Sequence, residues 1–159
     1  MLTEHLELRP LPPAAAAALL GDRDSAARLI GAKLSDEWPQ PDVLDVLPRH
    51  STLDQESVEF GVWLMIERAS GTVVGDIGFF GPPGEDRTVE IGYAVVPGRR
   101  RRGYATEAAT GIAGWALRQP GIDAVLARCD PDNEASIRTL ERAGFERTGE
   151  DGGQLRWRR

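Results

Sequence analysis

Residues 91–106 read IGYAVVPGRRRRGYAT, and this stretch decides how the rest of the chain is arranged. Its first part is apolar and rich in β-branched and aromatic residues, which is typical of a strand. Pro97 cannot continue the hydrogen-bond ladder of a central strand, so the strand ends there. From Gly103 onward, small apolar residues recur at spacings of three and four, which predicts a helix with one buried face. The stretch therefore predicts a strand, a glycine-containing turn and a helix.

The turn between this strand and helix carries four arginines at 99–102. Such a turn exposes backbone N–H groups at the positive end of the helix dipole, which favours an anion such as a diphosphate. Gly103 permits a close approach that a side chain would block, Ala105 is small, and Thr106 adds a hydroxyl donor. The alternative interpretation is a solvated run of charge followed by a tight turn.

Downstream of the turn, the pattern continues as helix, strand, helix and hairpin. A strand, a helix and a second strand across 88–129 form a parallel unit, which makes the sheet mixed. Gly144 is placed to end the second helix, and Gly152-Gly153 suits a hairpin turn. The expected elements are a helix from about 105 to 116, a strand at 124–129, a helix at 133–143 and a hairpin within 145–159.

Upstream, strands and turns alternate as in an antiparallel meander. The expected fold class is α/β (α+β), with a single mixed, mostly antiparallel sheet, and residues 1–159 form one domain. Asp42 is expected to cap a short helix through Leu47. The other expected elements are strands at 7–9, 60–66, 72–80 and 88–96, helices at 12–20 and 24–34, and a loop at 35–41.

Length and charge exclude several classes of protein. A chain of 159 residues is about one domain, large enough to bury a core without disulfides or metal. The net charge of -6 argues against a nucleic-acid partner, because phosphate contacts need a basic surface. No apolar run reaches the ~20 residues that span a bilayer, and the N-terminus lacks a signal-peptide pattern, so we expect a cytoplasmic protein without a membrane partner. Cys129 is a lone cysteine, and no spacing indicates a metal site.

Two motifs resemble the acetyl-CoA signature of the GNAT superfamily of N-acetyltransferases. The first is IGYAVVP at 91–97 followed by Arg-x-x-Gly-x-Ala at 100–105, where the superfamily carries Gln/Arg-x-x-Gly-x-Gly/Ala. The second is NEASIR at 133–138 with LERAGF at 140–145, which is similar to the superfamily's second CoA-contacting helix. The branch most similar is that of the ribosomal-protein N-terminal acetyltransferases. The resemblance covers nearly the whole chain and implies helices on both faces of a sheet that is splayed at its central parallel strand pair.

The resemblance implies that the chain binds acetyl-CoA as a co-substrate. A bulge would splay the strand before the arginines, leaving the backbone of Ala94, Val95 and Val96 free to bond the pantetheine arm like an added strand. Asn133 and Ser136 would reach the arm and the sulfur from one helix face, although Asn133 also suits an N-cap. The diphosphate would be held by N–H groups and an arginine among Arg100, Arg101, Arg102, Gly103, Tyr104, Ala105 and Thr106.

Acetyl transfer also needs a base and an acid. Glu90, two residues before Gly92 on the expected strand, is the candidate base, and an exposed strand carboxylate is the alternative. Many GNAT enzymes carry a tyrosine seven residues after the helix asparagine to protonate the departing thiolate, but this chain has Leu140 there. Ser136 is therefore the candidate acid, and the alternative is a hydroxyl that bonds back to its own helix.

The sequence thus predicts an N-acetyltransferase that passes an acetyl group from acetyl-CoA to a primary amine, of a peptide N-terminus or a small molecule, by direct attack in a ternary complex. The alternative function is a non-catalytic acyl-CoA-binding sensor or regulatory module. The sequence does not identify the amine acceptor, and it neither specifies nor excludes a homodimer. Four aromatic residues either wall an acceptor pocket or pack in the core, namely Trp38, Trp63, Phe79 and Phe80.

Overall fold

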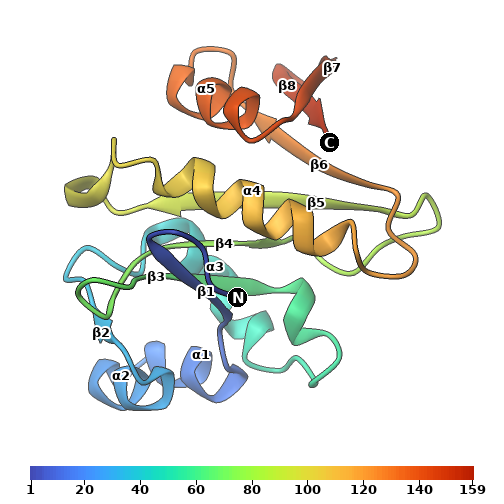
Figure 1. The fold of residues 1–159 in the computed structure, drawn as a ribbon. Helices are drawn as coiled ribbons and strands as arrows, with labels where there is room; N and C mark the ends of the chain where they lie inside the picture. Colours follow the sequence, from blue (N-terminus) through green and yellow to red (C-terminus); the bar gives the residue numbers. More distant parts are fainter.

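The computed structural model describes residues 1–159 as one eight-stranded sheet with helices on both faces (Figure 1). The strand order is β1-β3-β4-β5-β6-β8-β7, and β2 pairs with β4 off this path. Neighbouring strands are antiparallel except for β5 with β6 and β2 with β4. The predicted mixed, mostly antiparallel sheet is confirmed. The strands are β1 (Leu6–Pro10), β2 (Lys33–Leu34), β3 (Val62–Glu67), β4 (Thr72–Phe79), β5 (Thr88–Val95), β6 (Ala124–Cys129), β7 (Glu146–Asp151) and β8 (Gln154–Arg158).

Helices lie on both faces of the sheet. α4 (Tyr104–Ala116) crosses in front of β4 and β5 in Figure 1, and α3 (Pro41–His50) lies behind the strands. Trp115 of α4 packs on Trp63 of β3 and Phe79 of β4, with ring centroids 5.1 and 5.7 Å apart. None of the helices has both the length and the apolar content required to cross a membrane. The remaining helices are α1 (Pro13–Leu19), α2 (Arg23–Ile30) and α5 (Glu134–Arg142), with single 3₁₀ turns at Val58–Phe60 and Pro97–Arg99.

β5 separates from β6 half-way along its length, as Figure 1 shows. The two strands pair from Thr88 with Ala124 to Ile91 with Ala127, and no further. On its other side, β5 stays paired with β4 as far as Val95. The segment 92–95 is therefore a strand with a single neighbour, which is the splay that the sequence resemblance implied.

The expected bulge in this strand was a wrong prediction. The register between β4 and β5 is regular. A register shift occurs one strand away, where Met65 of β3 faces Gly75 of β4 but Ile66 faces Val73. Gly75 is required there because a Cβ atom at this position would collide with the carbonyl oxygen of Ala94. The splay results from the divergence of β6, while β5 itself stays regular.

The second predicted helix was too long. It ends at Ile30 because Gly31 adopts the left-handed conformation, with a φ of 69°, that commonly closes a helix. Lys33 and Leu34 then form β2, which pairs in parallel with the first two residues of β4.

The predicted bounds of α3 also need correction. Asp42 lies in its first turn and does not cap it, because Gln40 occupies the N-cap position and makes no side-chain bond there. The helix continues past Leu47 to His50. Its first turn nevertheless brings Asp42 to the face of the sheet where the candidate site lies.

Candidate active site

The unpaired half of β5 presents alternate backbone groups to the opening beside it. In an antiparallel ladder, every second residue exchanges its N–H and C=O with the neighbouring strand. Val96 donates its N–H to the Val74 carbonyl at 2.9 Å, so the even-numbered residues at this end of β5 face β4. The backbone groups of Tyr93 and Val95 therefore point to the side that β6 has left.

This alternation divides the residues predicted to bind the pantetheine arm. Val95 directs its N–H into the opening, whereas the N–H groups of Ala94 and Val96 face β4. The Val95 carbonyl already accepts a hydrogen bond from Arg100 Nε at 3.0 Å. The groups left in the opening are thus the N–H of Val95 and both the N–H and the C=O of Tyr93, a residue that sequence reasoning did not select for this role.

The turn before α4 has unpartnered donors where an anion would be held. Gly103 caps the helix in a left-handed conformation with a φ of 83°, and Arg101 has a φ of 62°. The next backbone donor with an acceptor is the N–H of Glu107, which bonds the Gly103 carbonyl at 2.9 Å. The N–H groups of residues 101–106 donate to no protein atom. Free N–H groups at the positive end of a helix of 13 residues attract an anion.

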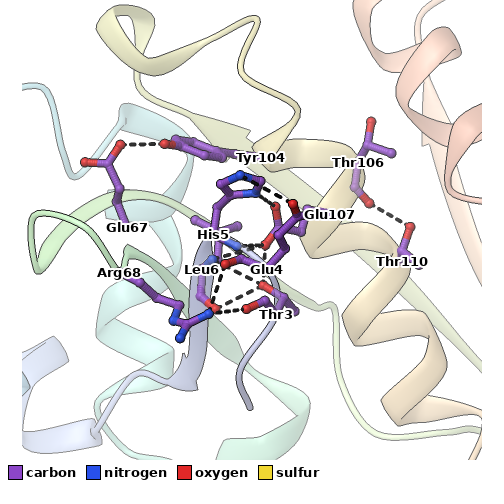
Figure 2. Close-up of polar contacts among 10 residues, drawn as sticks. All are labelled: Thr3, Glu4, His5, Leu6, Glu67, Arg68, Tyr104, Thr106, Glu107 and Thr110. Atoms are coloured by element: carbon purple, nitrogen blue, oxygen red, sulfur yellow. Dashed lines mark hydrogen bonds and ion pairs between the residues drawn. The ribbon is translucent and has the colours of Figure 1, made fainter.

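Glu67, at the end of β3, ties this turn to the sheet. Its buried carboxylate accepts hydrogen bonds from Arg99 Nη1 at 3.0 Å and from the Ser70 hydroxyl at 2.5 Å. The Tyr104 hydroxyl also donates to it (Figure 2), and Arg102 lies 3.7 Å away. The Ser70 hydroxyl first, and then Tyr104 and the two arginines, hold the pKa of Glu67 below its usual range in spite of burial. The turn is therefore anchored to a carboxylate that stays ionised at neutral pH.

The four arginines of the turn consequently differ in what they can still bind. Arg99 and Arg102 pair with Glu67, and Arg100 bonds the strand through Nε. Arg101 has no hydrogen-bond or ion-pair partner in the protein, which leaves its guanidinium to meet an incoming anion.

Glu107, in the first turn of α4, anchors the helix to the N-terminal segment. Its carboxylate accepts from the N–H of His5 at 2.7 Å and the N–H of Leu6 at 3.1 Å, and the Thr3 hydroxyl donates to it as well (Figure 2). Burial raises the pKa of Glu107, but the bonds from Thr3 and His5 outweigh it and lower the pKa overall. The start of α4 is thus held to Glu67 of β3 through Tyr104 and to the N-terminal segment through Glu107.

A cavity of about 630 Å³ opens on the α3 face of the sheet, beside the unpaired half of β5. Small residues of two strands form its floor, namely Gly78 of β4 with Gly92 and Ala94 of β5. α3 contributes one wall and the start of α5 another. The cavity is therefore bounded by α3 on one side and by the start of α5, with Asn133 and Ser136, on another. Its other lining side chains include Asp42, Val43, Val46, Arg49, His50, Leu53, Phe60, Asp76, Phe79, Phe80, Tyr93, Arg128 and Cys129.

Asp76 lines this cavity from β4, directly across the ladder from Ala94. One of its carboxylate oxygens accepts a hydrogen bond from Trp38 Nε1 at 2.8 Å. Burial raises the pKa of Asp76 to about 6, although the Trp38 bond acts in the opposite direction, and the nearby Asp42 raises it further. This carboxyl group therefore changes its charge close to neutral pH.

α5 brings Asn133 and Ser136 to the far side of the opening. Asn133 is the N-cap, and its side chain accepts from the Ser136 N–H at 3.1 Å. The Ser136 hydroxyl makes no hydrogen bond within the protein, so the bond back to its own helix is not formed. The Tyr93 hydroxyl donates to the Ser136 carbonyl at 3.4 Å, which links α5 to β5.

Glu90 lies outside the lining of the large cavity. Its half-buried side chain pairs with Arg128 Nε at 3.4 Å. Glu90 instead lines a neighbouring hollow of about 310 Å³ with Arg156 and Arg158, and Arg128 belongs to both spaces. The carboxylate is thus neither freely solvated nor directed to the groups around Asp76.

A family model described as an acetyltransferase (GNAT) domain matches residues 5–146. The chain belongs to the GNAT acetyltransferase family. It is 33% identical over 123 residues to the uncharacterised N-acetyltransferase YjdG of Bacillus subtilis, covering 76% of this chain and 73% of YjdG. RimL, a ribosomal L7/L12 α-N-protein acetyltransferase solved with coenzyme A, aligns with a TM-score of 0.71 at 18% identity, over 100% of this chain and 96% of that one. The microcin C7 self-immunity acetyltransferase MccE, solved with acetyl-CoA and AMP, aligns with a TM-score of 0.67 at 16% identity, over 98% and 92%.

Membership of the GNAT family confirms the predicted enzyme class, an acetyl-CoA-dependent N-acetyltransferase, and the predicted fold. The features of this chain fit that co-substrate. The free N–H groups of 101–106 suit a diphosphate, and the unpaired edge at Tyr93 and Val95 suits the amides of a pantetheine arm.

Other predicted candidates of this GNAT domain fall into two groups. Trp38, Trp63 and Phe79 are core residues, 1%, 4% and 7% exposed, and Phe79 also borders the cavity. Phe80 is exposed and lines the cavity. His50, to which the sequence assigned no role, is buried, donates from Nε2 to the Leu11 carbonyl and has its pKa lowered by burial. It is a structural residue of the cavity wall.

Asp76 and Glu67 are the side chains of the GNAT site that sequence reasoning missed. Asp76 is the single charged residue in the strand TVVGDIGF at 72–79, and a charge inside a buried strand is rare enough to be a signal. Glu67 closes the strand VWLMIE at 62–67 in the same way. Neither signal shows what the carboxylate contacts.

Proposed function

We propose that this acetyltransferase transfers the acetyl group of acetyl-CoA to a primary amine, of a peptide N-terminus or a small molecule, that enters the 630 Å³ cavity. One observation carries the proposal. The turn with the free N–H groups at 101–106 follows the unpaired end of β5 and is bonded to Val95 through Arg100, and the cavity opens beside the same segment of β5. A molecule that binds its diphosphate at the turn and extends along this edge delivers its far end to the cavity.

The residues proposed to hold acetyl-CoA are those whose hydrogen-bonding groups have no partner within the protein. The N–H groups of 101–106 and the Arg101 guanidinium would bind phosphate, while the Arg100 side chain and Tyr104 hold the turn in shape. The backbone of Tyr93 and Val95 would bond the pantetheine arm, and Ala94 and Val96 keep their place in the ladder with β4.

Acetyl-CoA supplies an acetyl thioester when bound. An N–H of the unpaired edge, at Val95 or Tyr93, would donate to the acetyl oxygen and stabilise the charge that develops there. Ser136, whose hydroxyl has no partner in the protein, would donate to the departing sulfur. Asn133 would hold the start of α5 in place through its bond to the Ser136 N–H.

The atoms of the reaction balance in direct transfer. The amine nitrogen forms a bond to the acetyl carbon, and the C–S bond breaks with its electron pair remaining on sulfur. The ammonium form of the acceptor loses two protons in all, one to a base and then solvent, and one that ends on sulfur. Glu90 is the base proposed from the sequence, and its carboxylate is paired with Arg128.

The alternative, an acyl-CoA sensor without turnover, binds the same molecule, so binding and turnover must be measured separately. We expect acetyl-CoA to bind with a Kd of micromolar order, and saturation at about 100 times Kd to stabilise the fold by roughly 2.7 kcal/mol. Thiol release from acetyl-CoA, followed with a panel of α-amines, polyamines and aminoglycosides, tests transfer. A melting temperature that does not change with millimolar acetyl-CoA would refute the proposal, and binding without thiol release for any amine would favour the sensor.

A further inference from the structure

We infer that Asp76 binds the ammonium group of the acceptor and accepts its proton, a role that rests on the proposed acetyl transfer. Asp76 is the cavity carboxylate that lies on the sheet itself, beside the unpaired half of β5. Asp42 comes from α3 and Asp130 from the end of β6. Of the three, Asp76 is the one directly opposed to β5, at Ala94, whereas Asp130 follows β6 and accepts a hydrogen bond from Gln154 Nε2 at 3.0 Å.

The register places Asp76 close to the reacting atoms. Asp76 and Ala94 are directly opposed in the ladder, and opposed residues of a hydrogen-bonded pair have Cα atoms about 5.5 Å apart. The N–H of Val95, the residue after Ala94, is free in the opening. Ala94 and Gly92 carry little or no side chain on the cavity floor, so nothing on β5 blocks the path from the carboxylate to that edge.

The carboxylate is held in place but is not neutralised. Trp38 Nε1 donates to one oxygen, and Trp38 is fixed because its side chain is 1% exposed. The second oxygen of Asp76 accepts no hydrogen bond and no cation pairs with it. Glu67 and Glu90, two carboxylates outside the cavity lining, are by contrast paired with Arg99 and Arg128. A free carboxylate oxygen in a cavity is a binding partner for an ammonium group.

The charges that face Asp76 favour a cation. Asp42 approaches from α3 and adds a second negative charge, while Leu64 of β3 and Ala94 of β5, the residues opposite Asp76 on either side, do not titrate. The other titratable side chains in the cavity lining are Arg49, His50, Tyr93, Arg128, Cys129 and Asp130. None of these makes a hydrogen bond or an ion pair with Asp76.

The raised pKa of about 6 agrees with this placement. A carboxyl group with that pKa is ionised at pH 7 and is a stronger base than an ordinary aspartate, whose pKa is about 3.9. Asp76 would take one proton from the bound ammonium and pass it to water at the cavity mouth. The nitrogen, now neutral, forms the bond to the acetyl carbon while the C–S bond breaks.

The deciding experiment compares Asp76→Asn with two matched variants. Asn can still accept the Trp38 bond but cannot take a proton. We expect kcat/KM at pH 7 to fall by about 100-fold or more, with the acetyl-CoA Kd changed less than about two-fold. The wild-type pH profile should show an acidic limb near pH 6 that is lost in Asp76→Asn. Asp42→Asn should move that limb to lower pH, and the exposed Asp45→Asn on the same helix should leave it in place.

Two readouts do not depend on turnover. A ¹³C carboxyl resonance of the free protein should titrate near pH 6, disappear in Asp76→Asn, and shift when an accepted amine is added. The second readout is the thermal stability of the protein. Because the folded pKa lies above the unfolded value, ionised Asp76 costs stability once the pH rises above its unfolded pKa, and the full cost is present above about pH 6. Asp76→Asn should therefore melt higher than wild type at pH 7.5 and not at pH 3.5, whereas a purely structural Asp76 would give a variant that melts lower.

The outcomes separate the two proposals. If wild type acetylates an amine but the acidic limb survives in Asp76→Asn, or disappears in Glu90→Gln instead, the inference about Asp76 is overturned and the proposed function stands. If wild type binds acetyl-CoA but acetylates nothing in the panel, the proposed function fails. In that case the absence of any amine effect on the Asp76 resonance overturns the inference as well.

Discussion

The turn at 101–106 follows β5 and the cavity beside Asp76 borders the same strand, yet the two are built from different parts of the chain. The turn offers backbone N–H groups, which every residue except proline carries, and its side chains mainly hold it to Glu67. The cavity offers side chains from α3, β4, β5 and α5, and each wall comes from a separate stretch of sequence. Backbone recognition survives many substitutions, whereas side-chain recognition changes with each one.

The difference teaches how one fold serves many acceptors. The diphosphate and pantetheine portions are common to every acetyl-CoA, so a site made of backbone groups can remain constant. The amine differs between acceptors, and the residues that would contact it, such as Asp42, Asp76 and Phe80, can change without disturbing the turn. Substitutions should therefore separate into those that affect acetyl-CoA affinity and those that affect turnover.

The largest loss of acetyl-CoA binding is expected from Gly103→Val. Gly103 has a φ of 83°, which a β-branched residue adopts only with strain, while a Cβ there meets no atom within 4 Å. The backbone must shift and carry the free N–H groups with it, so we expect the Kd to rise more than about ten-fold. Gly121→Val is the matched control, because Gly121 has a φ of 88° and open space but lies in the loop before β6. Calorimetric titration of both variants with acetyl-CoA measures the effect. Equal losses of affinity would show that backbone strain is responsible, and not displacement of the N–H groups at 101–106.

Ser136→Ala should affect turnover and spare affinity. Removing a hydroxyl that donates to sulfur only as the thiolate departs should lower kcat by about ten-fold, the scale of one lost transition-state hydrogen bond, with the acetyl-CoA Kd nearly unchanged. Ser57→Ala, which removes a hydroxyl from another part of the same cavity lining, provides the comparison. Steady-state kinetics at saturating acetyl-CoA distinguishes the two. Full turnover by Ser136→Ala would leave thiolate protonation to water.

A smaller loss of acetyl-CoA affinity than that of Gly103→Val is expected from Glu67→Gln, which keeps an acceptor for Ser70 and Tyr104 but removes the charge between Arg99 and Arg102. We expect the acetyl-CoA Kd to rise about three-fold and stability at pH 7 to fall by roughly 1–2 kcal/mol. Glu67 has a lowered pKa, so its contribution is present above the unfolded pKa and is lost as the pH falls through the folded one. Denaturant unfolding should therefore show wild type and variant converging in acid, with the exposed Glu56→Gln as control. A difference that persists at low pH would contradict the electrostatic explanation.

The contrast between the two regions also explains what sequence reasoning could reach. The turn lies within sixteen consecutive residues, 91–106, so its strand, glycine and helix are visible in a short window. Asp76 could be noticed but not interpreted, because its partners Trp38, Asp42 and Ala94 come from three distant segments. The choice of Glu90 followed from its position on β5, and only the fold shows that Arg128 faces it.

Two smaller errors, in the end of α2 and in the residues of β5 that face the opening, have separate causes. β2 has two residues and no periodic pattern of its own, and the prediction extended α2 through Gly31, although glycine is a common helix end. The alternation that assigns Val95 to the opening and Ala94 to β4 requires the register between strands, which a single strand does not contain. The resemblance selected the right segment of β5, and the pairing of β5 with β4 decides which backbone groups in that segment are free.

The bonds from Thr3, His5 and Leu6 to Glu107 have a consequence for how the chain acquires its site. The His5 contact joins residues 102 positions apart, and closing a loop of that length costs chain entropy before any contact repays it. During synthesis β1 is made before its partner β3 and before α4, which follow much later in the chain. A partly made chain therefore has no fixed α4 start, and the capacity to bind an anion there should arise late, together with closure of the whole sheet.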